Sequence, residues 1–166
     1  MRRLLCLFLV TLLSAGAALA QTPRVDRIEI TEFGIYELKQ IETKDAPGVA
    51  SGILKISNGR LIEQTATIPM RLGLSFGYSF RIVGSPARAM VTVRDVNIVP
   101  EPGLRNPKTD KVVYREEVEV EKPIGSVHRS DYTLCCDWTL VPGKWVFQLW
   151  IGDRKYAEQI FTLVKR

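Results

Sequence analysis

Apolar and polar residues alternate along much of the chain, and the clearest alternation spans Ser75 to Val83. Side chains two residues apart lie on the same face of a strand. This stretch therefore predicts a strand whose core-facing side is formed by Phe76, Tyr78, Phe80 and Ile82. Its other side is expected to be polar and exposed, and comprises Ser75, Gly77, Ser79 and Arg81.

The last third of the chain, Tyr132 to Val164, contains three more alternating runs. One face of the first run is formed by Tyr132, Leu134, Cys136 and Trp138. A proline-glycine turn is predicted at Val141–Lys144 and a two-residue hairpin turn at Gly152-Asp153. The inward positions of the second and third runs are Trp145, Phe147, Leu149, Ile151, Phe161 and Leu163. Because a buried aromatic side chain contributes about 2 kcal/mol or more, we expect these three strands to form the centre of the core.

The remaining strands are expected at Val25–Leu38, Ser51–Ile56, Leu61–Ile68, Met90–Val99 and Val112–Glu121. Gly34 indicates a bulge or bend, and Asn58-Gly59 indicates a tight hairpin. The proline-rich segment Pro100–Lys111 predicts an extended connection that crosses between two sheets. Helical spacing never persists beyond about one turn. The pattern therefore predicts an all-β fold, an antiparallel sandwich of about seven to nine strands.

Residues 1–20 have the pattern of a cleaved secretory signal peptide. Arg2 and Arg3 precede an apolar stretch, which ends in the small-residue tripeptide Ala18-Leu19-Ala20. Cleavage there is expected to leave residues 21–166 as a single domain that is secreted into the periplasm. The formal net charge falls from +5 to +3, because 21 basic residues then face 18 acidic ones. This small excess does not predict nucleic-acid binding, and no second long apolar run predicts a membrane span after removal of the signal.

Two segments resemble known proteins. The run V-P-G-K-W-V-F-Q-L-W-I-G-D-R-K-Y-A-E-Q-I-F-T-L resembles the closing hairpin of bacterial immunoglobulin-like domains. The run T-A-T-I-P-M-R-L-G-L-S-F-G-Y-S-F, together with P-G-K-W, is similar to a family of small secreted bacterial proteins of unknown function. The resemblance implies an immunoglobulin-like sandwich over nearly all of the mature chain, and implies no activity.

The adjacent cysteines Cys135 and Cys136 are the first candidates for chemistry. On a regular strand their side chains would point to opposite faces, which favours a buried Cys136 beside a more exposed Cys135. A strained disulfide between them and an intermolecular bond through Cys135 are the alternatives. A soft-metal site would take Cys135, Cys136, Asp137 and His128 as its ligands, but lacks a C-x-x-C spacing.

Other polar residues have simpler interpretations. His128 is expected in a solvated loop. The carboxylates Glu116, Glu117, Glu119 and Glu121 are expected on the solvated face of an edge strand, with a cation site as the alternative. The outer face of a sheet is expected to be solvated by Arg71, Arg81, Arg88 and Arg94, with a basic patch for an acidic partner or anionic glycan as the alternative.

No catalytic motif is present in the sequence, so we expect a non-enzymatic binding or interaction module, without a cofactor, for a protein or glycan partner. Its expected contact surface includes Cys135 and Trp150, which faces away from Phe147 and Leu149. One alternative is a thiol-redox or soft-metal protein that acts through the cysteine pair. Another is an enzyme whose site is assembled from scattered loop residues. The sequence indicates no oligomeric state.

Overall fold

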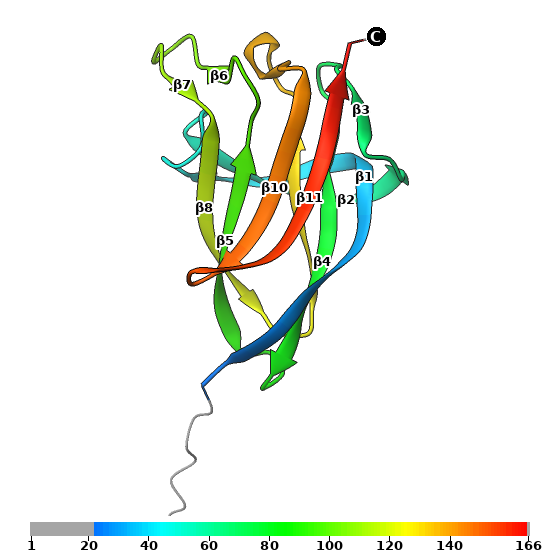
Figure 1. Cartoon of the computed structure of the whole chain (residues 1–166), viewed down its shortest axis with the longest axis vertical. Helices are drawn as coiled ribbons and strands as arrows, with labels where there is room; N and C mark the ends of the chain where they lie inside the picture. Colours follow the sequence, from blue (N-terminus) through cyan, green and yellow to red (C-terminus); the bar gives the residue numbers. More distant parts are fainter. Residues whose placement is uncertain (1–21, 166) are drawn as a thin grey trace, which may run out of the picture.

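The computed structural model describes residues 22–165, so the expected signal peptide lies outside the described residues. Two sheets pack face to face (Figure 1). The first sheet contains, in spatial order, β2 (Ile53–Glu63), β1 (Arg24–Asp45), β4 (Ser75–Ser85) and β9 (Val127–Thr133). The second contains β3 (Thr67–Pro69), β11 (Arg154–Val164), β10 (Gly143–Ile151), β5 (Met90–Ile98) and β8 (Arg115–Pro123).

A two-stranded ribbon of β6 (Leu104–Arg105) and β7 (Val112–Val113) accompanies these sheets. Every strand pair is antiparallel except β11 with β3. Eight of the described strands have seven residues or more, and the other three are short. The all-β antiparallel sandwich is therefore confirmed. The one helical segment within residues 22–165 is the three-residue turn Asp137–Thr139, so none of the described helical structure could cross a bilayer.

An aromatic cluster fills one half of the space between the sheets. The ring of Phe76 on β4 lies 5.9 Å from that of Trp145 and 5.4 Å from that of Phe147. The Phe161 ring lies 5.2 Å from both phenylalanines. The Trp145 indole Nε1 donates a 2.9 Å hydrogen bond to the carbonyl of Val141, so even its polar atom is satisfied. The predicted inward rows of β4, β10 and β11 are confirmed, since their aromatic side chains are fully or almost fully buried.

The β1–β2 hairpin extends well beyond the sheet that it starts in. β1 pairs with β4 as far as Tyr36, and with β2 from Ile35 onward. Gly34, with a φ of +144°, lies at this change of partner and confirms the predicted bend. The outer part of the hairpin, residues 38–59, is called the arm below. Figure 1 shows it running across the long axis of the sandwich, behind the second sheet.

The hairpin predicted at Asn58-Gly59 is wrong. β2 continues through both residues, with Asn58 opposite Lys39 and Gly59 opposite Leu38. The turn instead lies at Ala46–Gly52, where the Ala46 amide donates to the Gly52 carbonyl. Gly59 serves a close approach between strands, because a Cβ there would lie 2.1 Å from the carbonyl oxygen of Glu37.

Two connections also differ from the prediction. Pro100–Lys111 does not cross between sheets, because β5 and β8 pair directly in the second sheet. The chain changes sheet at other connections, among them the one after β9, which belongs to the first sheet while β10 and β11 belong to the second. The chain leaves its strand at Thr133, so Tyr132 to Trp138 is not one run, and Trp138 lies in the helical turn. The two-residue turn at Gly152-Asp153 is confirmed, with Ile151 opposite Arg154.

Candidate binding cleft between the two sheet edges

Polar residues occupy inward positions on β5 and β8. The inward row of β5 continues from Val93 to Asp95 and Asn97. In register, Asp95 lies opposite Val118 of β8, and Asn97 lies opposite Glu116. The interior of the sandwich therefore changes from aromatic to polar toward the β8 edge.

A cleft opens between the β8 edge of the second sheet and the β9 edge of the first. It consists of two adjoining cavities of about 450 and 460 Å³, and both are lined by Asp95, Val118 and Asp131. The second cavity also reaches Tyr132, Trp138 and the arm residues Val49, Ser51 and Ile53. This volume and mixed lining are in the range of small-molecule sites in proteins.

The cleft contains buried acceptor atoms that the protein leaves unsatisfied. Asp95 Oδ1 and Asn97 Oδ1 are both fully buried without a hydrogen-bond partner, as is the hydroxyl of Tyr78 nearby. Burial raises the pKa of Asp95 to about 6, although the neighbouring Ser130 hydroxyl and Lys122 lower it in part and Asp131 raises it. Burial likewise raises the pKa of Tyr78 well above its ordinary value. Unsatisfied buried groups are costly, so they mark a place where a partner would stabilise the protein.

Glu116 anchors the tip of the arm above the cleft. Its carboxylate Oε1 accepts a 2.7 Å hydrogen bond from the Ala50 amide, and Asn106 Nδ2 donates to the Ala50 carbonyl at the same distance. The Glu117 amide of β8 donates to the Gly48 carbonyl at 2.9 Å. A Cβ on Gly48 would lie 2.0 Å from the Glu117 carbonyl oxygen, so this contact requires glycine.

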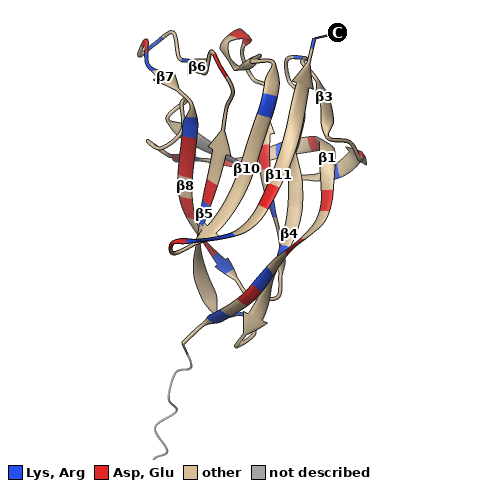
Figure 2. Ribbon diagram, in the orientation of Figure 1, with Lys and Arg blue, Asp and Glu red and all other residues tan. Residues whose placement is uncertain are grey.

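The expectation of a solvated Glu116 is wrong. Its side chain is 3% exposed, because it shares the inward face of β8 with Val118 and Val120. Burial raises the pKa of Glu116 to about 7, and the Ala50 hydrogen bond offsets part of that rise. The residues that alternate with this inward row, Arg115, Glu117 and Glu119, do face outward on this edge strand, as expected. Figure 2 shows charged residues along β8.

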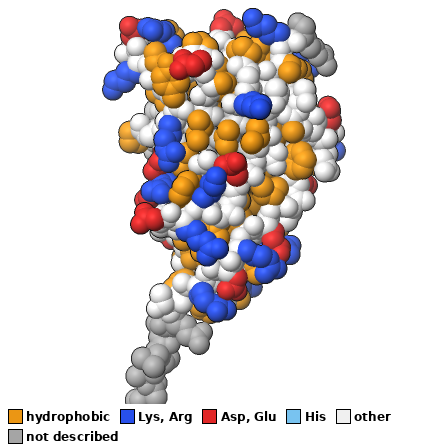
Figure 3. All heavy atoms as spheres, in the orientation of Figure 1, with side chains coloured by type: hydrophobic (Ala, Val, Ile, Leu, Met, Phe, Trp, Pro, Cys, Tyr) orange, Lys and Arg blue, Asp and Glu red, His pale blue; other side chains and the backbone are white. Residues whose placement is uncertain are grey.

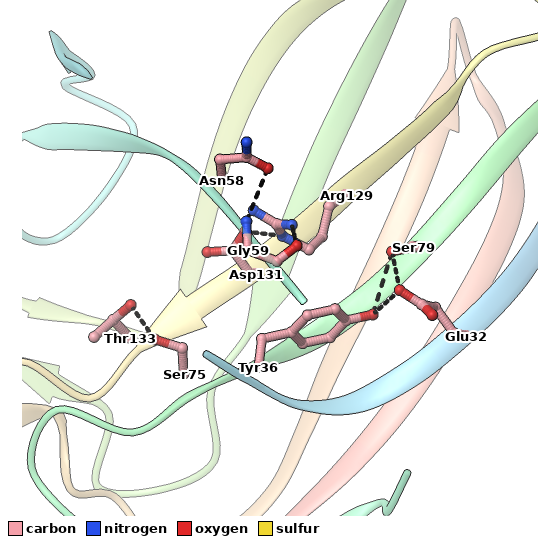
Figure 4. Close-up of polar contacts among 9 residues, drawn as sticks. All are labelled: Glu32, Tyr36, Asn58, Gly59, Ser75, Ser79, Arg129, Asp131 and Thr133. Atoms are coloured by element: carbon pink, nitrogen blue, oxygen red, sulfur yellow. Dashed lines mark hydrogen bonds and ion pairs between the residues drawn. The ribbon is translucent and has the colours of Figure 1, made fainter. Parts of the chain in front are cut away.

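Arg129 on β9 holds the arm at the root of the hairpin (Figure 4). Its guanidinium donates to the Asp131 carboxylate at 2.9 Å and to the Gly59 carbonyl at 3.4 Å, and lies 5.4 Å above the Tyr36 ring. Burial raises the pKa of Asp131, and Arg129 offsets part of that rise. The arm therefore covers the outer face of the first sheet.

A second group of polar contacts lies beneath the arm. The Ser79 hydroxyl donates to Glu32 at 2.9 Å, and the Tyr36 hydroxyl lies 3.3 Å from both residues. Burial raises the pKa of Tyr36 to about 12. Ser75 and Ser79 are almost fully buried. The exposed polar face predicted for β4 is therefore wrong at Ser75, Gly77 and Ser79, which are buried, and is confirmed at Arg81.

The cysteine pair lies at the mouth of the cleft. Cys135 is exposed and Cys136 half-buried, and both line the second cavity. Their Sγ atoms are 2.7 Å apart, so the expectation of opposite faces is wrong. The reason is that the pair follows the end of β9, where the chain enters the helical turn. There the Cys136 amide donates to the Thr139 hydroxyl, which in turn donates to the Cys136 carbonyl.

The structure does not bring together the four residues of the alternative soft-metal site. His128 lies within β9, where Nε2 is 3.0 Å from the Pro123 carbonyl and the ring packs on Phe80. The solvated-loop prediction for His128 is therefore wrong, and burial lowers its pKa. Asp137 is exposed at the start of the helical turn. Within residues 22–165, no three His, Cys, Asp or Glu side chains are grouped closely enough to hold a metal ion.

Trp150 lies on a different surface, the outer face of the second sheet. Its Nε1 donates to Gln148 at 3.0 Å, and Arg94 lies 5.6 Å above its ring. Figure 3 shows hydrophobic side chains between charged ones on this side of the molecule. Cys135 and Trp150 therefore do not form one surface. The arginines of the alternative basic patch are also separated, with Arg81 on the outer face of the first sheet and Arg94 on that of the second.

Sequence reasoning missed Asp95 and Asn97 and misplaced Glu116. A signal was present, because all three fall in phase with valines that point inward: Val91 and Val93 on β5, and Val118 and Val120 on β8. A polar residue in phase with an apolar row is either buried or marks an error in the strand assignment. The pattern did not show that the arm would cover this edge.

Comparisons with known proteins agree with the fold. Residues 24–163 match the family described as a domain of unknown function, DUF3859. The chain belongs to this family. An immunoglobulin-like protein from Pseudomonas aeruginosa has a similar structure, with 23% identity and a TM-score of 0.59 over 87% of this chain and 98% of that one. This DUF3859 protein therefore has an immunoglobulin-like fold, as expected from its closing hairpin.

A second solved structure is only weakly similar to the DUF3859 protein. It is an alkylpurine DNA glycosylase from Pseudomonas fluorescens, bound to DNA with an abasic-site analogue. The TM-score is 0.35, with 14% identity over 59% of this chain and 27% of that one. No curated protein matches the sequence.

Proposed function

We propose that this protein is an exported, non-enzymatic binding module of the periplasm, and that the cleft between β8 and β9 is its binding site. One observation carries the proposal: Asp95 Oδ1 and Asn97 Oδ1 are buried at a cavity of about 460 Å³ without any hydrogen-bond partner. A ligand that satisfies them stabilises the folded protein by mass action. The arm, held by Glu116 and Arg129, contributes Val49, Ser51 and Ile53 to the wall of this cleft.

The signal-like sequence of residues 1–20 supports export. Fractionation of bacteria that express the full chain tests it. We expect a periplasmic protein whose mass corresponds to a start at Gln21. A cytoplasmic protein that retains its first residues would contradict the export part of the proposal.

Binding is tested with the purified protein against a panel of small polar molecules, including sugars, by thermal unfolding. Ligands of the cleft are expected to raise the melting temperature, and the double variant Asp95→Asn/Asn97→Leu is expected to lose that shift. The variant Glu119→Gln, on the outer face of β8, serves as the control. A panel without any shift, together with native mass spectra that show no co-purified molecule, would overturn the binding site.

The cysteine pair supports a second candidate function, because the two Sγ atoms converge at 2.7 Å on the rim of the same cleft. Thiol–disulfide exchange with an oxidised dithiol protein would form an S–S bond between Cys135 and Cys136. The S–S bond of the partner would break, and the two protons and two electrons would pass to it, giving two thiols.

Thiol counting, intact mass and metal analysis of the periplasmic protein distinguish this candidate. A mass lower by two hydrogen atoms, restored by reductant and absent in Cys135→Ser, would support the redox function. Bound copper or zinc that is lost in Cys136→Ser would support the soft-metal version. Two reduced, unreactive thiols without metal would exclude both.

A further inference from the structure

The chemistry of the cleft indicates what kind of molecule it takes. The unsatisfied atoms of Asp95 and Asn97 are both acceptors. An ammonium or guanidinium group carries only donors, and its hydrogen bonds to a carboxylate are stronger than those between neutral groups. A ligand that presents an anion would leave these acceptors unsatisfied and add like charge.

The charged residues that line the cleft also favour a cationic ligand. The second cavity is lined by the carboxyl groups of Asp95, Asp131 and Glu116 and by one cationic side chain, that of Lys108. Asp131 is paired with Arg129, on the outer side of β9. No ion pair between described residues reaches Asp95 or Glu116, and Lys122, which lines the first cavity with Asp95, offsets the burial of that carboxyl group only in part. A buried carboxylate that is not paired with a cation is destabilising, and a bound cation supplies the missing partner.

The rest of the lining suits an organic cation. Val118, Ile53, Tyr132 and Trp138 give the cavity apolar and aromatic walls next to the carboxyl groups. An alkyl stem gains from burial against such walls, and an aromatic face attracts a cation. A bare metal ion would need several ligand groups at one point, and the described residues contain no such group.

We propose that the cleft binds a small organic cation with an apolar stem, whose ammonium or guanidinium group donates to Asp95 Oδ1 and Asn97 Oδ1. This inference rests on the proposed binding function and names the ligand class for that site. Glu116 and the arm residues Val49, Ser51 and Ile53 line the cavity where the stem would lie.

Calorimetric titration with three probes of equal length tests the inference. The probes are 1,4-diaminobutane, the neutral 1,4-butanediol and the anionic succinate, each at millimolar concentration with the protein purified from the full-length gene. Only the diamine is expected to bind. Asp95→Asn, which keeps the shape and removes the charge, is expected to weaken binding by about tenfold or more. Glu119→Gln is expected to bind as the unaltered protein does.

The outcomes separate this inference from the proposed function. Binding of butanediol or succinate at the cleft, equal to that of the diamine, overturns the cation class and leaves the binding site in place. Absence of binding by all three probes overturns the cation class. The panel of polar molecules then decides the binding site separately. Diamine binding that is unchanged in both Asp95→Asn and Asn97→Leu, each verified as folded by circular dichroism, places the cation elsewhere and also overturns the inference.

Discussion

Two neighbouring strands of the second sheet, β10 and β5, face the same interior with opposite chemistry. Phe147 and Leu149 on β10 are fully buried among aromatic rings. Their register partners on β5 are Asn97 and Asp95, which present unsatisfied acceptors to the cleft. One step across the sheet thus separates residues that stabilise the fold from residues whose burial costs free energy. The inward residues of β5 near the β8 edge therefore do not contribute to stability as those of β10 do.

The largest expected effect comes from separate substitutions at Phe147 and at its register partner Asn97. Phe147→Ala is expected to lower the free energy of unfolding by about 3–5 kcal/mol, because it removes a fully buried ring and leaves a cavity. Asn97→Leu, at the adjacent position, is expected to be neutral or stabilising, because it replaces an unsatisfied acceptor by an apolar group of similar size. Urea unfolding followed by fluorescence measures both. A loss of several kcal/mol in Asn97→Leu would show that Asn97 belongs to the stabilising half.

The pH dependence of stability tests the cleft side of this comparison between β10 and β5, through the buried Glu116 on β8. The native pKa of Glu116, about 7, is above its ordinary value of 4.5, so the folded state binds this proton more tightly than the unfolded chain. The stability that Glu116 contributes is therefore fully present below about pH 4.5 and is lost as the pH rises to 7. The loss is of the order of 3 kcal/mol, since each pKa unit corresponds to about 1.4 kcal/mol.

Unfolding curves of the unaltered protein and of Glu116→Gln between pH 4 and 8 isolate this effect from other titrating groups. The difference between the two proteins is expected to change over that window, and Glu119→Gln is expected to follow the unaltered protein. Parallel profiles for all three would contradict a buried, titrating Glu116.

The stabilising half of the molecule was largely predictable from the sequence, and the cleft was not. Alternation alone places Phe76, Trp145 and Phe147 inside, because period-two spacing determines which face a side chain takes once a strand exists. The cleft depends on tertiary placement. Asn58-Gly59 has the strongest local hairpin signal, yet it lies within β2, because the hairpin turns earlier and its arm crosses two sheet edges. No local rule specifies that a carboxylate on β8 will meet the backbone of Ala50.

The contact of the arm with β8 is expected to depend on Gly48. In Gly48→Ala the new Cβ would collide with the Glu117 carbonyl oxygen, now 2.0 Å from that position, so the tip must leave the strand. The loss of the backbone hydrogen bond between Glu117 and the exposed Gly48 is expected to cost about 1 kcal/mol. Amide exchange at Glu117 and Ala50 is expected to accelerate by about tenfold or more, while the amides of β10 remain protected. The exposed Lys44→Ala substitution on the same arm is the control, and equal exchange in both variants would contradict the anchor.

The smallest effect is expected on the outer face of the second sheet, at Trp150. Trp150→Phe keeps a ring beneath Arg94 but removes the donor that Gln148 accepts at 3.0 Å. This half-buried hydrogen bond is expected to contribute about 0.5–1 kcal/mol to the free energy of unfolding. Ligand binding at the cleft is expected to stay unchanged, because Trp150 and the cleft lie on opposite faces of that sheet. Chemical denaturation measures the first effect and diamine titration the second. A weaker diamine affinity in Trp150→Phe would show that the two faces of the sheet are coupled, and the contrast between them would then have to be explained through β5, which carries Arg94 outward and Asp95 inward.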